Sequence, residues 1–186
     1  MEDFTMKIMI ASDIHGSVYY LKQLAQDVER EAPDRLLLLG DLLYHGPRND
    51  IPKDYSPREA AAILNGLQDR IICIRGNCDA DVDQMLLEFP ITAKHCILYA
   101  GGRMIFATHG DQYNLGALPP LHRGDILLHG HTHLQAWEPF GEDNYYFNPG
   151  SVSIPFGDTK QAYMMLTEEE AVWKELGGEP FHTVKL

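Results

Sequence analysis

The stretch Arg35-Leu36-Leu37-Leu38-Leu39-Gly40-Asp41 decides the fold. Four consecutive leucines are apolar on both faces of an extended chain, a pattern typical of a strand that is buried on both sides of a parallel sheet. Two further short apolar runs, 7–11 and 71–74, also end at polar turn residues. Because helix signals separate these three runs, we expect a right-handed β-α-β-α-β unit.

Two helices are predicted between the strands. In the first, apolar residues recur at three- and four-residue spacing, and Pro33 follows them; they are Val18, Leu21, Leu24, Ala25 and Val28. In the second, Ser56-Pro57-Arg58-Glu59 has the pattern of a capping box with proline at the first helical position. This second helix is predicted to run to about Asn65.

The second half of the chain predicts strands with few helices. Segments 94–100, 104–108 and 126–128 are strand-like, and Gly101-Gly102 joins the first two as a hairpin. Segments 135–140 and 145–147 indicate another hairpin, and 161–166, 171–176 and 180–184 continue in the same way. We therefore expect one α/β domain over residues 1–186, with a later sheet that is largely antiparallel.

Composition and charge exclude several classes of protein. Of 186 residues, 45% are hydrophobic, which is enough for a substantial core. The net charge of −12 disfavours binding of long nucleic acids. No apolar run approaches the roughly 20 residues of a membrane span. Residues 1–5 are partly acidic and lack an apolar stretch, so we expect no secretory signal. Three cysteines without CxxC spacing favour a reduced, cytoplasmic protein.

Metal-ligand side chains follow five of the predicted strands. The candidates are Asp13, His15, Asp41, Asn77, His109, His131 and His133. Strand ends of open α/β sheets form ligand sites, and in each of the pairs 13/15 and 131/133 the two side chains point the same way on an extended backbone. A lone Asp or His at a strand end is usually a turn former or a satisfied polar group. The ordered set across five strand ends is what indicates a shared metal centre.

The chemistry of these donors favours a pair of metal ions. Carboxylate, amide and imidazole groups together suit first-row divalent cations such as manganese, iron, nickel or zinc. Seven donors are too many for one tetrahedral ion but suit two ions about 3.5–4 Å apart with a bridging carboxylate.

This ordered set resembles the motif series of the calcineurin-like metallophosphoesterase superfamily. Segments 12–16, 45–49, 75–79 and 147–153 are similar to its small bacterial YfcE-type phosphodiesterases. The resemblance covers roughly residues 6–166 and implies a four-layer α/β/β/α sandwich of two mixed sheets. It also implies two divalent metal ions, with Mn²⁺ preferred and Fe, Ni, Co or Zn as alternatives.

By this resemblance, one metal takes Asp13, His15, Asp41 and His133, and the other takes Asp41, Asn77, His109 and His131. Asp41 is then the bridge. A hydroxide held between the two ions would attack phosphorus in line with the leaving oxygen. Residues 148–153 are expected to form a turn packed near the site.

Four further residues are candidates for roles in catalysis or substrate binding. Many members of the superfamily carry histidine where this chain has Cys78, which is either a space filler or a weak proton donor. His45 is either a phosphate contact or a residue that holds the following turn. Arg48 and Arg75 are candidate phosphate clamps; the alternatives are a solvated surface arginine for Arg48 and a partner of nearby carboxylates for Arg75.

We therefore expect a metal-dependent phosphodiesterase that acts on a small phosphate ester, with no membrane or long nucleic acid as partner. The alternatives are a phosphomonoesterase, a protein-binding scaffold on the same fold, and a nuclease, which the acidic charge argues against. The apolar segment Met85 to Ile91 is a candidate contact for a homo-oligomer.

Overall fold

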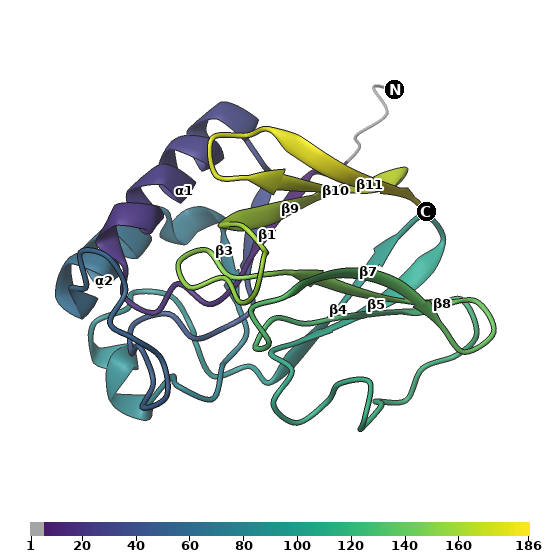
Figure 1. Ribbon diagram of the computed structural model, residues 1–186, viewed down its shortest axis with the longest axis horizontal. Coiled ribbons are helices and arrows are strands. Elements are labelled where there is room, and N and C mark those ends of the chain that lie inside the picture. The colour runs from purple at the N-terminus through teal and green to yellow at the C-terminus, as the bar shows by residue number, and fades with distance from the viewer. Residues whose placement is uncertain (1–5) are drawn as a thin grey trace.

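The computed structural model describes residues 6–186 and contains two β-sheets packed face to face (Figure 1). Residues 1–5, where the absence of a secretory signal was expected, lie outside the described part. The first sheet has the order β11 (Pro180–Lys185), β10 (Glu170–Glu175), β9 (Ala162–Leu166), β1 (Ile8–Ala11), β2 (Arg35–Leu38) and β3 (Ile71–Cys73). The second has the order β4 (His95–Ala100), β5 (Arg103–Thr108), β6 (Ile126–Leu128), β8 (Asn144–Pro149) and β7 (Gln135–Phe140).

Strand β2 is buried on both faces, as the leucine run predicted. Leu36 and Leu38 belong to the core between the first sheet and the helices. Leu37 and Leu39 belong to the core between the two sheets. All four side chains are fully shielded from solvent. The parallel pairing of β1 with β2 and of β2 with β3 confirms the predicted β-α-β-α-β unit.

Helices α1 (Val18–Glu31) and α2 (Pro57–Asn65) cover the face of the first sheet that is turned away from the second (Figure 1). The start of α2 was predicted correctly, but the capping box is not formed, because the Ser56 side chain makes no cap hydrogen bond. The backbone N–H of Ser56 instead donates to the carbonyl of Gly16 at 2.9 Å. The carboxylate of Glu59 forms an ion pair with Lys22 Nζ at 2.9 Å. Two 3-10 helices, η1 (Gln68–Arg70) and η2 (Asp81–Met85), flank β3.

The predicted hairpins are confirmed, but the expectation of a largely antiparallel later sheet is wrong. Strands β9, β10 and β11 join the first sheet through antiparallel pairing of β9 with β1. In the second sheet, β5 pairs with β6 and β6 pairs with β8 in parallel. Strand β9 lies in the interior of the first sheet because all five of its residues are buried, which suits a strand covered on both faces. Both sheets are therefore mixed, as the family resemblance implied.

The outer face of the second sheet is covered by irregular chain. Phe106, Leu127, Ala136 and Tyr146 form a small apolar cluster there, and Leu121 packs against it. Within residues 6–186, the segment between β5 and β6 contains no α-helix. No helix of the described chain is long and apolar enough to cross a membrane.

The apolar segment from Met85 to Ile91 serves mainly the core of this chain. Leu87, Phe89 and Ile91 are buried against the helices. Met85 and Leu86 remain exposed, so the segment offers less apolar surface to a second copy than its sequence indicates. A homo-oligomer stays a prediction.

Glu31, the last residue of α1, links the helix to the first sheet. Its carboxylate accepts hydrogen bonds from Lys174 Nζ at 2.8 Å and Tyr163 Oη at 3.2 Å, and Lys7 Nζ lies 3.4 Å away. Burial alone would raise the pKa of Glu31, but the hydrogen bonds and charges of Lys174 and Lys7 lower it. A carboxylate with a lowered pKa stabilises the fold above its ordinary pKa, and this contribution is lost as the pH falls through the lowered value.

We therefore expect Glu31→Gln to lower the free energy of unfolding by about 1 kcal/mol at pH 7. The difference from wild type should shrink as the pH falls below about 4, because the wild-type carboxylate then loses its charge. Urea unfolding at several pH values measures this. A deficit of the same size at pH 7 and pH 3 would contradict the ion-pair explanation, and Glu142→Gln on the exposed surface is the control.

Candidate metal centre

The candidate ligands occupy the loops that follow five strands, all at one end of the two sheets. Asp13 and His15 follow β1, Asp41 follows β2 and Asn77 follows β3. His109 follows β5, and His131 and His133 follow β6. All but two of these side chains are buried; the exceptions are Asn77 and His131. The structure therefore brings the seven predicted residues together from positions that span most of the chain.

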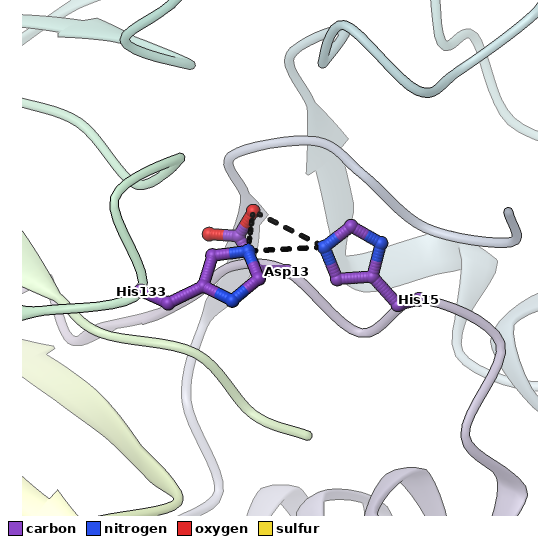
Figure 2. A group of neighbouring side chains, drawn as sticks. All are labelled: Asp13, His15 and His133. Atoms are coloured by element: carbon purple, nitrogen blue, oxygen red, sulfur yellow. Dashed lines mark hydrogen bonds and ion pairs between the residues drawn. The ribbon is translucent and has the colours of Figure 1, made fainter. Parts of the chain in front are cut away.

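Asp13, His15 and His133 form the first group of donor atoms (Figure 2). The Nε2 atoms of the two histidines face each other at 3.1 Å. Asp13 Oδ1 lies 3.7 Å from His15 Nε2 and 3.4 Å from His133 Nε2. Three donor atoms from two separate loops thus converge on one small volume.

Asp41, His109 and His131 form the second group, and Asn77 adjoins it. His109 Nε2 lies 3.5 Å from Asp41 Oδ2, 2.9 Å from Asn77 Oδ1 and 3.2 Å from His131 Nδ1. The same oxygen of Asp41 lies 3.7 Å from His15 Nε2 in the first group. Asp41 therefore stands between the two groups, in the position expected of a shared ligand.

The backbone that presents these side chains is not extended. Five candidate ligands have φ values between 49° and 66°, in the left-handed region: Asp13, His15, Asp41, His131 and His133. Among the described non-glycine residues, only Ala32 and Asp54 share this conformation. The prediction that the pairs 13/15 and 131/133 lie on extended backbone is therefore wrong, although both pairs do converge. Left-handed residues cost about 1 kcal/mol or more each and cluster at functional sites.

Backbone carbonyls fix the orientation of three imidazoles. The Nδ1 atoms of His15, His109 and His133 lie 2.8, 2.7 and 2.6 Å from the carbonyl oxygens of Tyr44, Leu39 and Ile154 respectively. A carbonyl oxygen only accepts, so each Nδ1 carries a proton and donates it. The Nε2 atom of each ring is then left to face the centre, which is the usual arrangement of metal-binding histidines.

A buried carboxylate, Asp79, holds two of the ligand loops together. It accepts backbone N–H groups of Asp41 at 2.9 Å, Leu42 at 2.8 Å and Gly76 at 2.7 Å. This role was not predicted from the sequence, although Asp79 ends the segment 75–79 that resembles the family. Its only sequence signal is an acidic residue directly after a candidate ligand loop.

Two serines brace the loop of Asp13. Ser151 Oγ and Ser153 Oγ donate to the Asp13 carbonyl at 2.8 and 3.1 Å, and both residues are buried. This agrees with the predicted turn near the site. Gly76 is required for a different reason, because a Cβ there would lie 2.2 Å from Asp41 Oδ1.

The electrostatics of the site favour positive charge at its centre. Burial would raise the pKa of Asp13, yet His133 and His15 hold it well below its usual value. Burial would lower the pKa of His109, but the Asp41 and Asp13 carboxylates raise it to about 9. Burial and the neighbouring His109 lower the pKa of His131.

An unpartnered carboxylate oxygen is separate evidence that the donor set fits a divalent cation. Asp13 Oδ1 is buried and has no hydrogen-bond partner among residues 6–186. An orphaned buried carboxylate oxygen is costly unless a cation or donor satisfies it. It lies beside two imidazole nitrogens whose opposite ring nitrogens are already engaged.

The four other candidate residues are placed differently from one another. Arg48 and Arg75 line a cavity of about 610 Å³, the Arg48 cavity, together with Cys78 and with Asp41, His131 and His133 of the metal centre. His45 is not among the residues that line it; its ring packs edge-on between Tyr44 and Tyr55. Cys78 is half-buried, and burial with Asp41 raises its thiol pKa to about 12. Its Sγ also comes within reach of His15 and Asp41.

Two mixed sheets with nitrogen and oxygen donors gathered at one end define a metal-dependent phosphoesterase. The chain belongs to the calcineurin-like phosphoesterase superfamily, whose family model matches residues 6–171. It is therefore a phosphoric ester hydrolase, and this family implies a divalent metal.

Comparison with known proteins agrees with this family. The chain is 44% identical over 164 residues to phosphodiesterase YfcE of Escherichia coli K12. The matched residues make up 88% of this chain and 89% of that protein. The solved structure of this E. coli phosphoesterase matches with a TM-score of 0.90 at 41% identity, over 96% of this chain and 98% of that one. A Vps29 complexed with Zn²⁺ from Entamoeba histolytica, at 20% identity, shares the fold, with a TM-score of 0.54 over 97% of this chain and 99% of that chain.

Replacement of Asp79 tests whether the second layer of hydrogen bonds positions the ligands. We expect Asp79→Asn to weaken Mn²⁺ binding roughly 10- to 100-fold, because one amide oxygen cannot accept three N–H groups as the carboxylate does. Calorimetric titration with Mn²⁺ measures this affinity. The exposed Asp69→Asn should bind like wild type, and equal affinities for all three proteins would show that Asp79 does not position the ligands.

Proposed function

We propose that this protein is a metal-dependent phosphodiesterase that hydrolyses small phosphodiesters with the help of two divalent cations. The supporting observation is the position of Asp41 Oδ2, 3.7 Å from His15 Nε2 in one donor group and 3.5 Å from His109 Nε2 in the other. One carboxylate oxygen within reach of both groups suits a bridging ligand. The 44% identity to an E. coli phosphodiesterase supports the same activity.

The ligands divide between two cations as follows. Asp13, His15, Asp41 and His133 would hold one, and Asp41, Asn77, His109 and His131 would hold the other. Mn²⁺ is our first choice for a mixed set of carboxylate, amide and imidazole donors, with Fe, Ni, Co or Zn as alternatives. When bound, the cations would lower the pKa of a water molecule so that it could act as the nucleophile near neutral pH, and they would neutralise charge on the phosphoryl oxygens.

The protein's own residues position the ester. Arg75 is held by Asp79 O, which accepts from its Nε at 3.2 Å, and by Asp81 Oδ1, 2.5 Å from its Nη1. Its guanidinium is thereby fixed at the wall of the Arg48 cavity, next to Asn77. Arg48 is exposed in the same cavity and would contact phosphate oxygens. We assign Cys78 to filling space beside Gly46 rather than to proton donation, because a thiol donates hydrogen bonds weakly.

The size and charge of the molecule support a small substrate. The Arg48 cavity, about 610 Å³, lies within the range of small-molecule sites. The net charge of −12 disfavours a long polyanion. The free state of all three cysteines supports a cytoplasmic location.

The test compares turnover of bis(para-nitrophenyl) phosphate and para-nitrophenyl phosphate by the Mn²⁺-loaded full chain. We expect a higher kcat/KM for the diester, and loss of activity on chelation with EDTA. Asp41→Asn should lower kcat by about 10³-fold or more, because both cations lose a charged ligand. Asp69→Asn is the control for an exposed carboxylate.

Three outcomes would contradict the proposal. Preference for the monoester would make the protein a phosphomonoesterase. Absence of turnover for both esters after metal loading would favour a binding scaffold on this fold. Full activity of Asp41→Asn would remove Asp41 from the centre.

A further inference from the structure

A second cavity adjoins the Arg48 cavity at Asn77, which lines both. It measures about 430 Å³ and is lined by three residues that it shares with the first cavity and by Gly76, Lys94, Thr108, Asp111 and Gln112. We call it the Lys94 cavity. Arg75, Asn77 and Asp79 line both cavities. The two therefore meet at a candidate ligand of the metal centre.

The Lys94 cavity is built by the strands that deliver Asn77 and His109. Beyond β3, Arg75 N donates to Ala93 O at 2.7 Å, which fixes the chain entering β4 beside the Asn77 loop. At the end of β5, buried Thr108 Oγ1 donates to Lys94 O at 3.2 Å. Asp111 and Gln112 follow directly after the His109 loop. The cavity walls are thus tied to the same strand ends as the ligands.

The shape of a phosphodiester matches this pair of cavities. Its phosphorus carries two ester substituents, and both must leave the metal centre in different directions. On hydrolysis, water oxygen bonds to phosphorus, the bond to one ester oxygen breaks, and that oxygen takes up a proton to leave as an alcohol. The other substituent stays on the product monoester.

Charge decides which substituent enters which cavity. The departing oxygen gains negative charge, which Asp111 in the Lys94 cavity would oppose. Arg48, Lys94 and Asp111 all have no ion-pair partner within 4.0 Å among residues 6–186, so Lys94 and Asp111 offset each other in the Lys94 cavity. In the Arg48 cavity, Asp79 already accepts three backbone N–H groups and Asp81 pairs with Arg75, so the charge of Arg48 is not offset and favours the departing oxygen there. The retained substituent is then left with the Lys94 cavity.

We propose that the Lys94 cavity binds the retained substituent of the substrate, and that this substituent is an uncharged, hydroxylated group of about the size of a sugar or glycerol. The proposal rests on the phosphodiesterase activity proposed above. Lys94 donates hydrogen bonds, Asp111 accepts them, and Gln112 does both. Hydroxyl groups both donate and accept, so they satisfy this set.

Other substituents fit these side chains less well. A phosphate or carboxylate would face Asp111, and an alkyl or phenyl group would leave the polar side chains without partners. Lys94 and Gln112 are therefore specificity-determining residues.

The experiment varies the retained group while the leaving group stays constant. Thymidine 5′-(para-nitrophenyl phosphate) retains a deoxyribose sugar with its thymine base. Bis(para-nitrophenyl) phosphate, the phenyl ester, retains a para-nitrophenyl ring without hydroxyl groups. Both release para-nitrophenolate. With the Mn²⁺-loaded full chain, we expect Lys94→Gln and Gln112→Ala each to lower kcat/KM for the thymidine ester roughly two- to tenfold, mainly through KM, the effect of one lost hydrogen bond. The ratio of kcat/KM for the thymidine ester to that for the phenyl ester should fall accordingly.

The control is Lys185→Gln, which removes an equivalent charge from the far edge strand β11 and should keep the wild-type ratio. A parallel fall for both esters in Lys94→Gln or Gln112→Ala would indicate a structural role and overturn the inference. Wild-type ratios in both variants would overturn it too, while leaving diester hydrolysis intact. Failure of the wild type on every diester would instead reject the proposed function, and this inference with it.

Discussion

The site depends on two buried carboxylates, Asp13 and Asp41. Both lie within 4.0 Å of His15, and the other groups of the site compensate their negative charge. Burial of an ionised carboxylate is costly unless positive charge or hydrogen bonds compensate it. Among residues 6–186, every ion-pair contact of these two side chains within 4.0 Å is to a histidine. The raised pKa of His109 is the response of one imidazole to this field. A centre built in this way favours cations.

The convergence of these groups depends on backbone that is held in an unfavourable conformation. Asp13, Asp41 and His131 adopt left-handed φ values that cost free energy at a non-glycine residue. Asp79 compensates by binding three N–H groups of the neighbouring loops, and Ser151 binds the Asp13 carbonyl. The absence of a side chain at Gly76 lets its loop approach Asp41 closely, which also helps to position that carboxylate. The hydrogen bonds and the packed sheets thus offset the conformational cost of the left-handed residues and keep the donor atoms in place.

The sequence predicted the strand ends and the side chains that gather beyond them because both follow from local patterns. The leucine run before Asp41 marks a strand buried on both faces, and a polar donor after such a strand lies at the sheet edge. It could not predict the pairing of β9 with β1, which depends on contacts between residues more than 150 positions apart. Nor could it predict the left-handed backbone at His15 and His133, since only a small minority of histidines adopt this conformation. The edge-on packing of His45 between two tyrosines is likewise a tertiary effect.

The most direct test of the account is the number and position of cations held by this site. Anomalous diffraction from crystals soaked in Mn²⁺ would locate them. Two peaks about 3.5–4 Å apart, one on each side of the Asp41 carboxylate, are the result that the account predicts. A single peak, or peaks that Asp41 does not contact, would contradict a shared two-metal centre.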